Sequence, residues 1–464
     1  MTLLSTIALA QPAWEAQVEP QEEEAGGFTF LAVVQARASA SNVVTTNPFF
    51  NGQVVGVLGG PNGTQVSDED RSVTTEQRAV GFLTYRPVAL DNQAGLTAAF
   101  EVDFAWGDSA YGTGGNAGGG FGGDQVNLQT RRLYADFDAG PTHTVVGLQF
   151  MGDGVHDPTR VSSLDALVRS GGRLMVFGSE AGGIQHFGHL EAVSWRLGAF
   201  TLLEGSFSDN DDVGLLLADA ELRPAPGLSV GLHAWHLRDR SSGALGPTSV
   251  LSDLQGAVQI DTAGPLVDAD LSWVGVDAGY NSDLRLGRAG VHGVVLANAG
   301  RLYIEDHPDQ DLTSLLVDIE GRARFAPGAG SLVRAELLYT APGFVTGNAY
   351  GIVGAAWSTH GCLLLHPDSL AINRQVAQFS DVSAGGSGMV ALSGSIGYDL
   401  VPNRVNVTVG GGHAVVAEGS AQEGNVRVTV TPLPLLRTGL AGAYLSRPDT
   451  DAWMAMATLD WMVF

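Results

Sequence analysis

The chain has 464 residues, with 24 Lys and Arg against 49 Asp and Glu, a formal net charge of −25 and a pI near 4.6. An acidic chain without a basic cluster is a poor partner for a polyanion, so we expect no nucleic-acid partner. Because 44% of the residues are hydrophobic and only 16% are charged, the composition also excludes a chain that is disordered throughout.

Residues 1–10 have the pattern of a signal-peptide remnant. Ala8-Leu9-Ala10 before Gln11 fits the small-x-small cleavage pattern, although the basic segment that starts such a peptide is missing. The alternative is a short apolar N-terminus without a targeting role. Residues 11–27 carry five glutamates and two prolines, which predicts a flexible acidic tail.

From residue 28 onward, alternating runs predict β-strands separated by turns and loops. No apolar run reaches the roughly 18 residues that a spanning helix requires, but a membrane strand needs only about 9–11 residues. The predicted strands are Phe28–Ser39, Val73–Arg86, Leu96–Trp106, Leu128–Asp138, Thr144–Met151, Ile184–Trp195, Ala199–Phe207, Val213–Arg223, Leu228–Leu237, Asp270–Tyr280, Leu286–Ala297, the two strands of the hairpin Asp311–Tyr339, Met389–Leu400, Arg404–Val416, Val426–Thr431, Leu436–Leu445 and Ala452–Phe464.

The hairpin Asp311–Tyr339 shows the alternation most clearly. On its first strand, Val317 and Ile319 fall on one side of a two-residue repeat, and Asp318 and Glu320 fall on the other. A soluble sheet would bury the apolar side, whereas a membrane barrel turns it toward lipid and turns the charges toward a watery lumen. One hairpin does not separate these two interpretations.

The connections between the predicted strands are alternately long and short along the whole chain. With the N-terminus on one side, all long connections lie at the opposite rim, which is typical of outer-membrane barrels and not of a Greek-key sandwich. The sequence therefore predicts an all-β chain, a single transmembrane antiparallel β-barrel spanning residues 28–464. About 18 strands are expected, with 16 as the alternative. A soluble secreted β protein is the competing class.

Aromatic residues are placed near both ends of the predicted strands, as expected for two membrane–water interfaces. The alternative is that aromatics simply favour strands. The predicted outer belt is Trp106, Phe150, Phe207, Trp235, Tyr339 and Tyr444, and the predicted inner belt is Tyr85, Phe137, Tyr280, Phe325, Tyr398 and Phe464.

In these features the chain resembles the bacterial outer-membrane porins. It ends in Phe464 on an apolar strand, like the terminal aromatic of that class, although Asp460 interrupts the expected alternation. The block Leu128–Met151, with Arg131-Arg132-Leu133-Tyr134 and Val146-Gly147-Leu148-Gln149-Phe150, looks like the fourth and fifth strands of DcaP-like porins. Alginate-export and carboxylate-specific channels are similar in strand number.

The resemblance implies a location in the outer membrane of a Gram-negative cell, with lipid and lipopolysaccharide around the barrel and a homotrimeric assembly. It places the acidic tail in the periplasm. It also implies that the loop after the fifth strand, residues 152–183, folds inward and narrows the pore. Its candidate constriction residues are Asp153, Asp157, Arg160, Asp165, Arg169 and Arg173. The alternative is a loop lying outside over the rim.

The alternation assigns a set of charged side chains to the lumen, where ionised groups are solvated and act on passing solutes. We expect either an arginine set (Arg132, Arg322 and Arg334) facing carboxylates across a narrowing, or a solvated wall of ion pairs. The predicted lumen residues are Arg37, Glu101, Asp103, Arg132, Asp136, Asp219, Glu221, Asp318, Glu320, Arg322, Arg334 and Glu336.

Chemistry other than passage has little support. The single cysteine, Cys362, excludes an intrachain disulfide and a cysteine-based metal site. Acidic loop clusters lack the spacing of a calcium loop, and no nucleophile motif accompanies the scattered histidines. We expect no enzyme, cofactor or metal. The sequence predicts passive diffusion of small hydrophilic solutes through a water-filled pore, with a plugged barrel whose long loops bind a partner or surface as the alternative.

Overall fold

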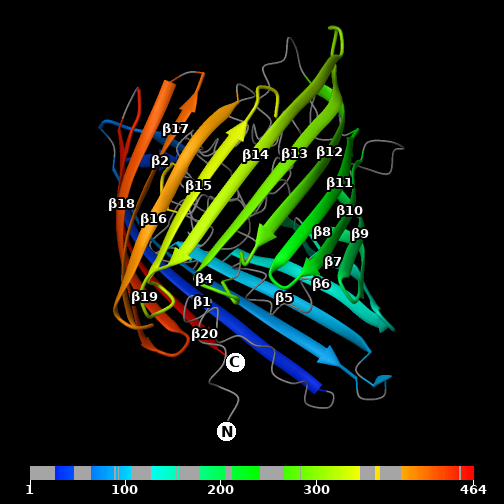
Figure 1. The fold of residues 1–464 in the computed structure, drawn as a ribbon, viewed down its shortest axis with the longest axis horizontal. Helices are drawn as coiled ribbons and strands as arrows, with labels where there is room; N and C mark the ends of the chain where they lie inside the picture. Colours follow the sequence, from blue (N-terminus) through cyan, green and yellow to red (C-terminus); the bar gives the residue numbers. More distant parts are fainter. Residues whose placement is uncertain are drawn as a thin grey trace.

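A computed structural model describes residues 27–45, 64–69, 71–87, 90–91, 93–105, 127–152, 154–155, 178–203, 212–240, 266–282, 284–344, 361–365, 388–417, 419–448 and 451–463. Within these ranges the chain forms one 18-stranded sheet in which every pair of hydrogen-bonded neighbours is antiparallel (Figure 1). No helix in the described ranges is long and apolar enough to cross a membrane.

The strands follow the predicted order, with two short additions in the first long connection. They are β1 (Gly27–Ser41), β2 (Val43–Thr45), β3 (Thr64–Val66), β4 (Ser72–Arg86), β5 (Ala94–Ala105), β6 (Asn127–Ala139), β7 (Thr142–Gly152), β8 (Gly178–Leu190), β9 (Val193–Leu203), β10 (Val213–Ala225), β11 (Leu228–Asp239), β12 (Leu266–Tyr280), β13 (Ala289–Ile304), β14 (Gln310–Arg324), β15 (Leu332–Thr340), β16 (Met389–Val401), β17 (Val405–Val416), β18 (Gly419–Leu433), β19 (Leu436–Ser446) and β20 (Ala452–Val463). The short hairpin β2–β3 was not predicted.

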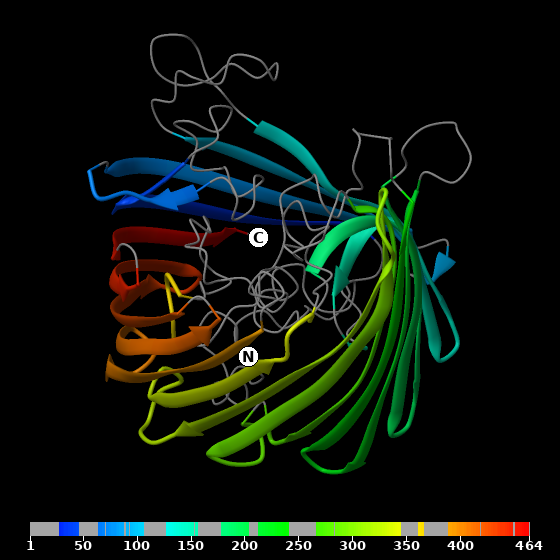
Figure 2. The same cartoon turned by 90° about the horizontal axis from the view of Figure 1, so that it is seen from above.

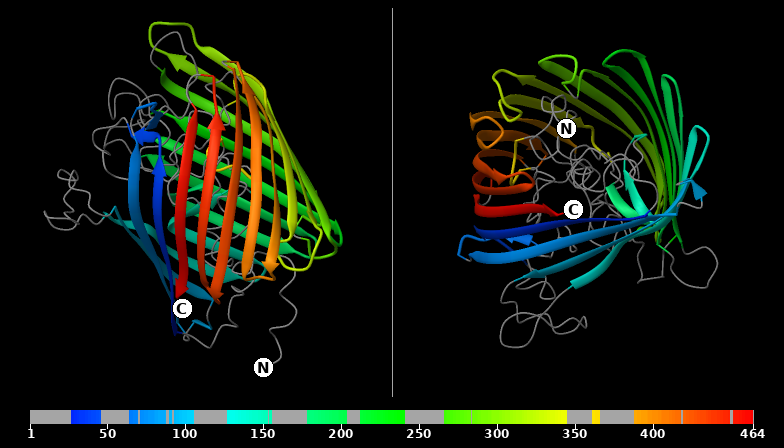
Figure 3. Two further views of the ribbon diagram at one scale, coloured as in Figure 1. Left: turned by 90° about the vertical axis from the view of Figure 1, so that its left-hand side faces the viewer. Right: turned by 90° about the horizontal axis from the view of Figure 1, so that it is seen from below.

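The sheet closes on itself where the first strand meets the last. β1 pairs with β20 from Ala32↔Val463 to Ser41↔Met454, and its other edge pairs with β4. The strands therefore form a ring when the barrel is seen from above (Figure 2). The first strand, in blue, and the last strand, in red, lie side by side in Figure 3. A closed ring has no free edge, which is what a membrane-spanning sheet requires. The prediction of an antiparallel barrel of about 18 strands is confirmed.

Tight turns close one rim of the barrel, as predicted, with one turn misplaced. The predicted alternation of long and short connections along the whole chain is wrong, because at the other rim only two residues join β17 to β18 and only five join β13 to β14. The sequence placed the turn between β8 and β9 at Arg196–Gly198, but the chain turns at Glu191 and Ala192. Glu191 adopts a left-handed φ of 45°, a conformation for which the sequence offers no Gly or Asn signal. By contrast, Gly227 takes a φ of 76° in the correctly predicted turn between β10 and β11.

The two faces of the strands differ in polarity as the alternation predicts. On β14, Ile319 is 47% exposed on the outer face, whereas its neighbours Asp318 and Glu320 are 4% and 2% exposed on the inner face. Asp460 was expected to interrupt the alternation on β20, but this was wrong. It continues the inward series, accepting hydrogen bonds from Arg437 and from Gln35 of β1.

The aromatic belts stay a prediction, although most of the described belt residues lie on the outer face as expected. Residues of the inner belt are exposed on the outer face, namely Tyr85, Phe137, Tyr280, Phe325 and Tyr398. Tyr339 and Tyr444 are exposed at the other end, but Trp235 is buried inside the barrel, so its assignment to the outer belt was wrong. Trp106, Phe207 and Phe464 lie outside the described residues, as does the side chain of Phe150.

Candidate solute passage

The β14–β15 hairpin carries two rows of like charge on its inner face. Glu320 lies opposite Glu336, and one step closer to the turn Arg322 lies opposite Arg334. The Nη2 of Arg322 is 2.7 Å from the Oε1 of Glu320, so the rows compensate each other along the strand. The structure thus brings together four of the predicted lumen residues in one patch of ionised groups.

The predicted third arginine lies on the far wall. Arg132 belongs to β6, and strands β7–β13 separate β6 from β14 around the ring. Its guanidinium carbon is 5.5 Å from the centroid of the Phe82 ring, a cation–π contact. Nearby, Asp136 accepts a hydrogen bond of 2.6 Å from Arg86. Arg132 and the Arg322–Arg334 pair therefore face the lumen from opposite sides.

Of the remaining predicted site residues, the structure describes some and leaves others outside the described part of the chain. Arg37 on β1 is buried and donates to the Sδ of Met454 at 3.3 Å. Glu101 and Asp103 belong to β5, but their side chains lie outside the described part of the chain. The candidate constriction residues also lie outside the described residues, namely Asp153, Asp157, Arg160, Asp165, Arg169 and Arg173. The predicted loop 152–183 is shorter than expected, because β8 begins at Gly178.

A chain of hydrogen-bonded charges that the sequence analysis did not assemble crosses β9–β13. Arg196 donates from Nε to Asp219 at 2.8 Å, and His233 Nδ1 lies 2.7 Å from the other oxygen of Asp219. The Nε2 of His233 lies 2.7 Å from Asp277, which also receives His292 Nε2 at 3.1 Å. Both ring nitrogens of His233 face carboxylates, an arrangement that suits a cationic ring donating from both sides.

This chain was missed for two reasons. Arg196 was assigned to a turn, so it was left out of the inward set. His233 and His292 were not singled out, although both occupy inward positions of the alternation on β11 and β13. Following the two-residue repeat through the histidines would have found them. In the described ranges, no group of three His, Cys, Asp or Glu side chains is arranged to hold a metal.

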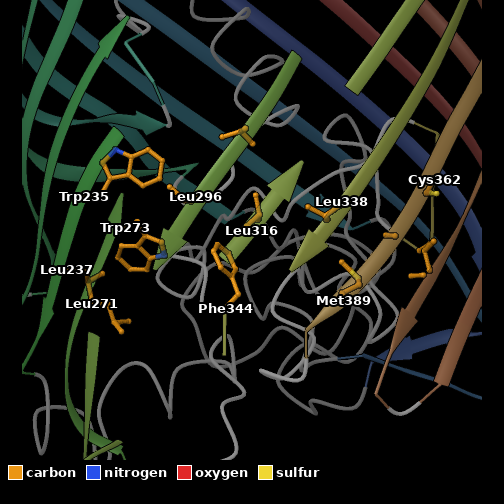
Figure 4. Packing of buried hydrophobic residues seen from close by; sticks show 14 of the residues in the cluster. Trp235, Leu237, Leu271, Trp273, Leu296, Leu316, Leu338, Phe344, Cys362 and Met389 are labelled. Carbon is orange, nitrogen blue, oxygen red and sulfur yellow. The ribbon is translucent and has the colours of Figure 1, made fainter. Parts of the chain in front are cut away.

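The inner wall becomes apolar toward the long connections. Trp235 and Trp273 lie opposite each other on β11 and β12, and both are buried. Figure 4 shows them with Leu296, Leu316 and Leu338, which follow on neighbouring strands, and with Phe344 from the connection after β15. Trp235 also donates from Nε1 to Asp219 at 3.0 Å, which joins the apolar part of the wall to the charged part.

No family model and no curated protein matches the chain. Solved structures do. The outer membrane protein OpdK of Pseudomonas aeruginosa is 12% identical, over 94% of this chain and 100% of that one, with a TM-score of 0.50. The structure of OpdK with vanillate is 13% identical in sequence to this chain, with the same coverage and TM-score. OccK8 (OprE) of the same organism is 11% identical over 94% and 98% of the two chains, with a TM-score of 0.51.

At this level of identity the comparisons establish the fold. The chain is an 18-stranded antiparallel β-barrel of the architecture found in bacterial outer-membrane porins, and this part of the resemblance is confirmed. The closer likeness to DcaP-like porins stays a prediction.

Proposed function

We propose that the chain is an outer-membrane channel through which small hydrophilic solutes diffuse. The observation that carries the proposal is the polarity of the closed wall. Large apolar side chains such as Leu232, Val274 and Leu440 are exposed on its outside, while carboxylates and guanidinium groups occupy the inside. Water would have to cover this apolar surface in a soluble protein, whereas lipid covers it at no cost.

The inner wall supports passage of polar solutes because it carries both signs of charge on opposite sides. The buried Arg132 lies on one wall, and the Glu320–Arg322 patch lies on the other. A lining of both signs of charge can interact with dipolar solutes without barring either ion sign outright. OpdK has been crystallised with vanillate, an aromatic carboxylate, so aromatic carboxylates belong among the candidate solutes together with sugars, amino acids and dicarboxylates.

Current through single molecules in planar bilayers tests this proposal. We expect steady current steps that scale with salt concentration, and swelling of proteoliposomes in small sugars and amino acids. Absence of both in correctly folded, heat-modifiable protein would contradict the channel. The homotrimer, the contacts with lipid and lipopolysaccharide, the inward position of residues 152–183 and the absence of enzymatic activity stay predictions.

A second candidate is a plugged barrel whose long loops bind a partner or a surface. The observation that favours it is the apolar part of the inner wall, where Trp273, Leu296 and Phe344 are fully buried instead of facing water. A plugged barrel would give folded protein in detergent but no steady current. The bilayer recordings therefore separate the two candidates.

A further inference from the structure

The connection between β15 and β16 meets the inner wall at two separate places. The first is just after β15, where the Ser314 hydroxyl donates to the carbonyl of Ala341 at 2.9 Å and Asn298 donates to the carbonyl of Gly343 at 3.4 Å. Phe344 follows and is buried in the apolar part of the wall. This contact lies on β13 and β14, on one side of β15 and β16.

The second contact lies on the other side, on β18, and is a carboxylate cradle. The backbone N–H of Leu363 donates to Oε1 of Glu423 at 2.6 Å, and those of Leu364 and Leu365 donate to Oε2 at 2.8 and 2.5 Å. Three consecutive backbone donors on one buried carboxylate form an anion nest, here filled by the protein's own side chain. Asn425, two residues further along β18, donates to the carbonyl of Gly361.

The wall is shaped to receive this segment, Gly361–Leu365. All five of its residues are buried, and it lies against β16 and β17 at positions without side chains. A Cβ on Gly412 would stand 2.7 Å from the Sγ of Cys362, and one on Gly410 would collide with the carbonyl of Gly361. Close approach of the two backbones therefore depends on glycine at these inward positions.

We propose that Glu423 and Asn425 are positioning residues that fasten Gly361–Leu365 to the inner wall and thereby set the width of the solute passage. The inference rests on the proposed channel function. We call these hydrogen bonds from Glu423 and Asn425 to Gly361–Leu365 the clamp. While the clamp is intact, the segment lies flat on β16–β18 and the solute passage keeps one width. When glutamine replaces Glu423, an NH2 group takes the place of one carboxylate oxygen, so at least one of the three buried backbone donors loses its acceptor, and the segment leaves the wall to find water. It then enters and leaves the passage.

Labelling of Cys362 tests the clamp without any current. In the folded protein the thiol is buried, so maleimide reacts slowly. Glu423→Gln should speed the reaction at least about tenfold, because each lost hydrogen bond to a charged group corresponds to roughly that change in an opening equilibrium. The matched control is Asp460→Asn, another inward carboxylate, whose hydrogen bonds join wall residues only. Equal rates in the two variants and the wild type would overturn the clamp.

A disulfide tests the placement of the segment. Gly412→Cys should form a bond with Cys362 on mild oxidation, which protects both thiols from maleimide after unfolding, and the outward-facing Val409→Cys should leave both reactive. If Gly412→Cys folds and remains fully reactive, the segment does not lie where we place it. If this variant does not fold, the labelling rates of Glu423→Gln decide the question.

Bilayer recordings connect the clamp to passage. We expect Glu423→Gln to close or change conductance level several-fold more often than the wild type. The double variant that combines Glu423→Gln with Gly412→Cys should return to steady current once its disulfide with Cys362 is formed. A reductant should abolish this rescue. Faster labelling with unchanged current would overturn the role in passage and leave the channel intact. A wild type that passes no current would instead contradict the proposed function, while the labelling still decides the clamp.

Discussion

The inner wall over β10–β14 divides into two halves of opposite character. Toward the tight turns it carries Asp219, His233, Asp277, His292 and Glu320. Toward the long connections the same strands, in the same inward register, carry Leu215, Trp235, Trp273, Leu296 and Leu316, all buried. Facing inward is therefore not one environment. The half near the tight turns carries mostly charged groups, and the other half carries mostly apolar side chains that belong to a hydrophobic cluster inside the barrel.

This division has a physical reason. The inward charged groups, although themselves buried, are hydrogen-bonded to one another, whereas the inward apolar side chains pack against each other and against another part of the chain. Phe344, from the connection between β15 and β16, is a described piece of that part. The border between the halves passes through Asp219, which binds Arg196 and His233 on its charged side and Trp235 on its apolar side.

The largest expected effect lies in the apolar half. Trp273→Ala removes a side chain that is 0% exposed, which should lower the free energy of unfolding by about 3–5 kcal/mol through lost burial and the remaining cavity. Denaturant unfolding in detergent micelles, followed by far-UV circular dichroism so that the readout does not depend on tryptophan fluorescence, measures this free energy. The neighbour Val274 faces outward and is 62% exposed, so Val274→Ala is the control and should cost less than about 1.5 kcal/mol. Equal losses would show that Trp273 does not contact a packed core.

A smaller effect is expected in the charged half. Asp219→Asn keeps the shape but replaces a carboxylate acceptor for Arg196, His233 and Trp235 by an amide with a single oxygen. We expect a loss of about 1.5–3 kcal/mol, the range for hydrogen bonds to charged groups. Glu221→Gln, on the same strand, is the control, since its partner Arg223 is exposed and such pairs contribute about 1 kcal/mol or less. If Asp219→Asn is as mild as the control, the five-residue chain is not a stabilising network.

The comparison also shows how far the sequence carries. Alternation and turn residues predict the ring, because each strand obeys a local two-residue repeat and Gly227 or Asn403 marks a turn. They also predict that Asp318, Glu320 and Arg322 face inward. What they miss depends on contacts between distant segments. The cradle joins Glu423 to Leu363–Leu365 some sixty residues earlier, and nothing in the local pattern around either segment predicts the pairing.

The predictions for two single residues were also wrong, for local reasons. Trp235 was read as an interfacial aromatic from its place near a strand end, but its inward parity, shared with His233, decides its environment. Arg196 was lost to a turn because Glu191 turns the chain without a turn-forming residue. In both cases the place of the residue in the two-residue repeat was a better guide to its environment than its position along the strand.

The smallest effect is expected at the solvated rim beyond the apolar half, between β19 and β20. There Asp451 accepts hydrogen bonds from the Tyr444 hydroxyl and the backbone N–H of Arg447, which hold the pKa of its carboxyl below the ordinary value. A lowered pKa means that the interaction stabilises the folded state above the carboxyl's ordinary pKa and is lost as the pH falls through the lowered one. Tyr444→Phe should raise the pKa of Asp451 toward its ordinary value, as read from the carboxyl carbon by NMR titration. Because the site is exposed to solvent, the free energy of unfolding near neutral pH should hardly change. A large loss would mean that Tyr444 and Asp451 belong to the buried core and not to the solvent-exposed rim.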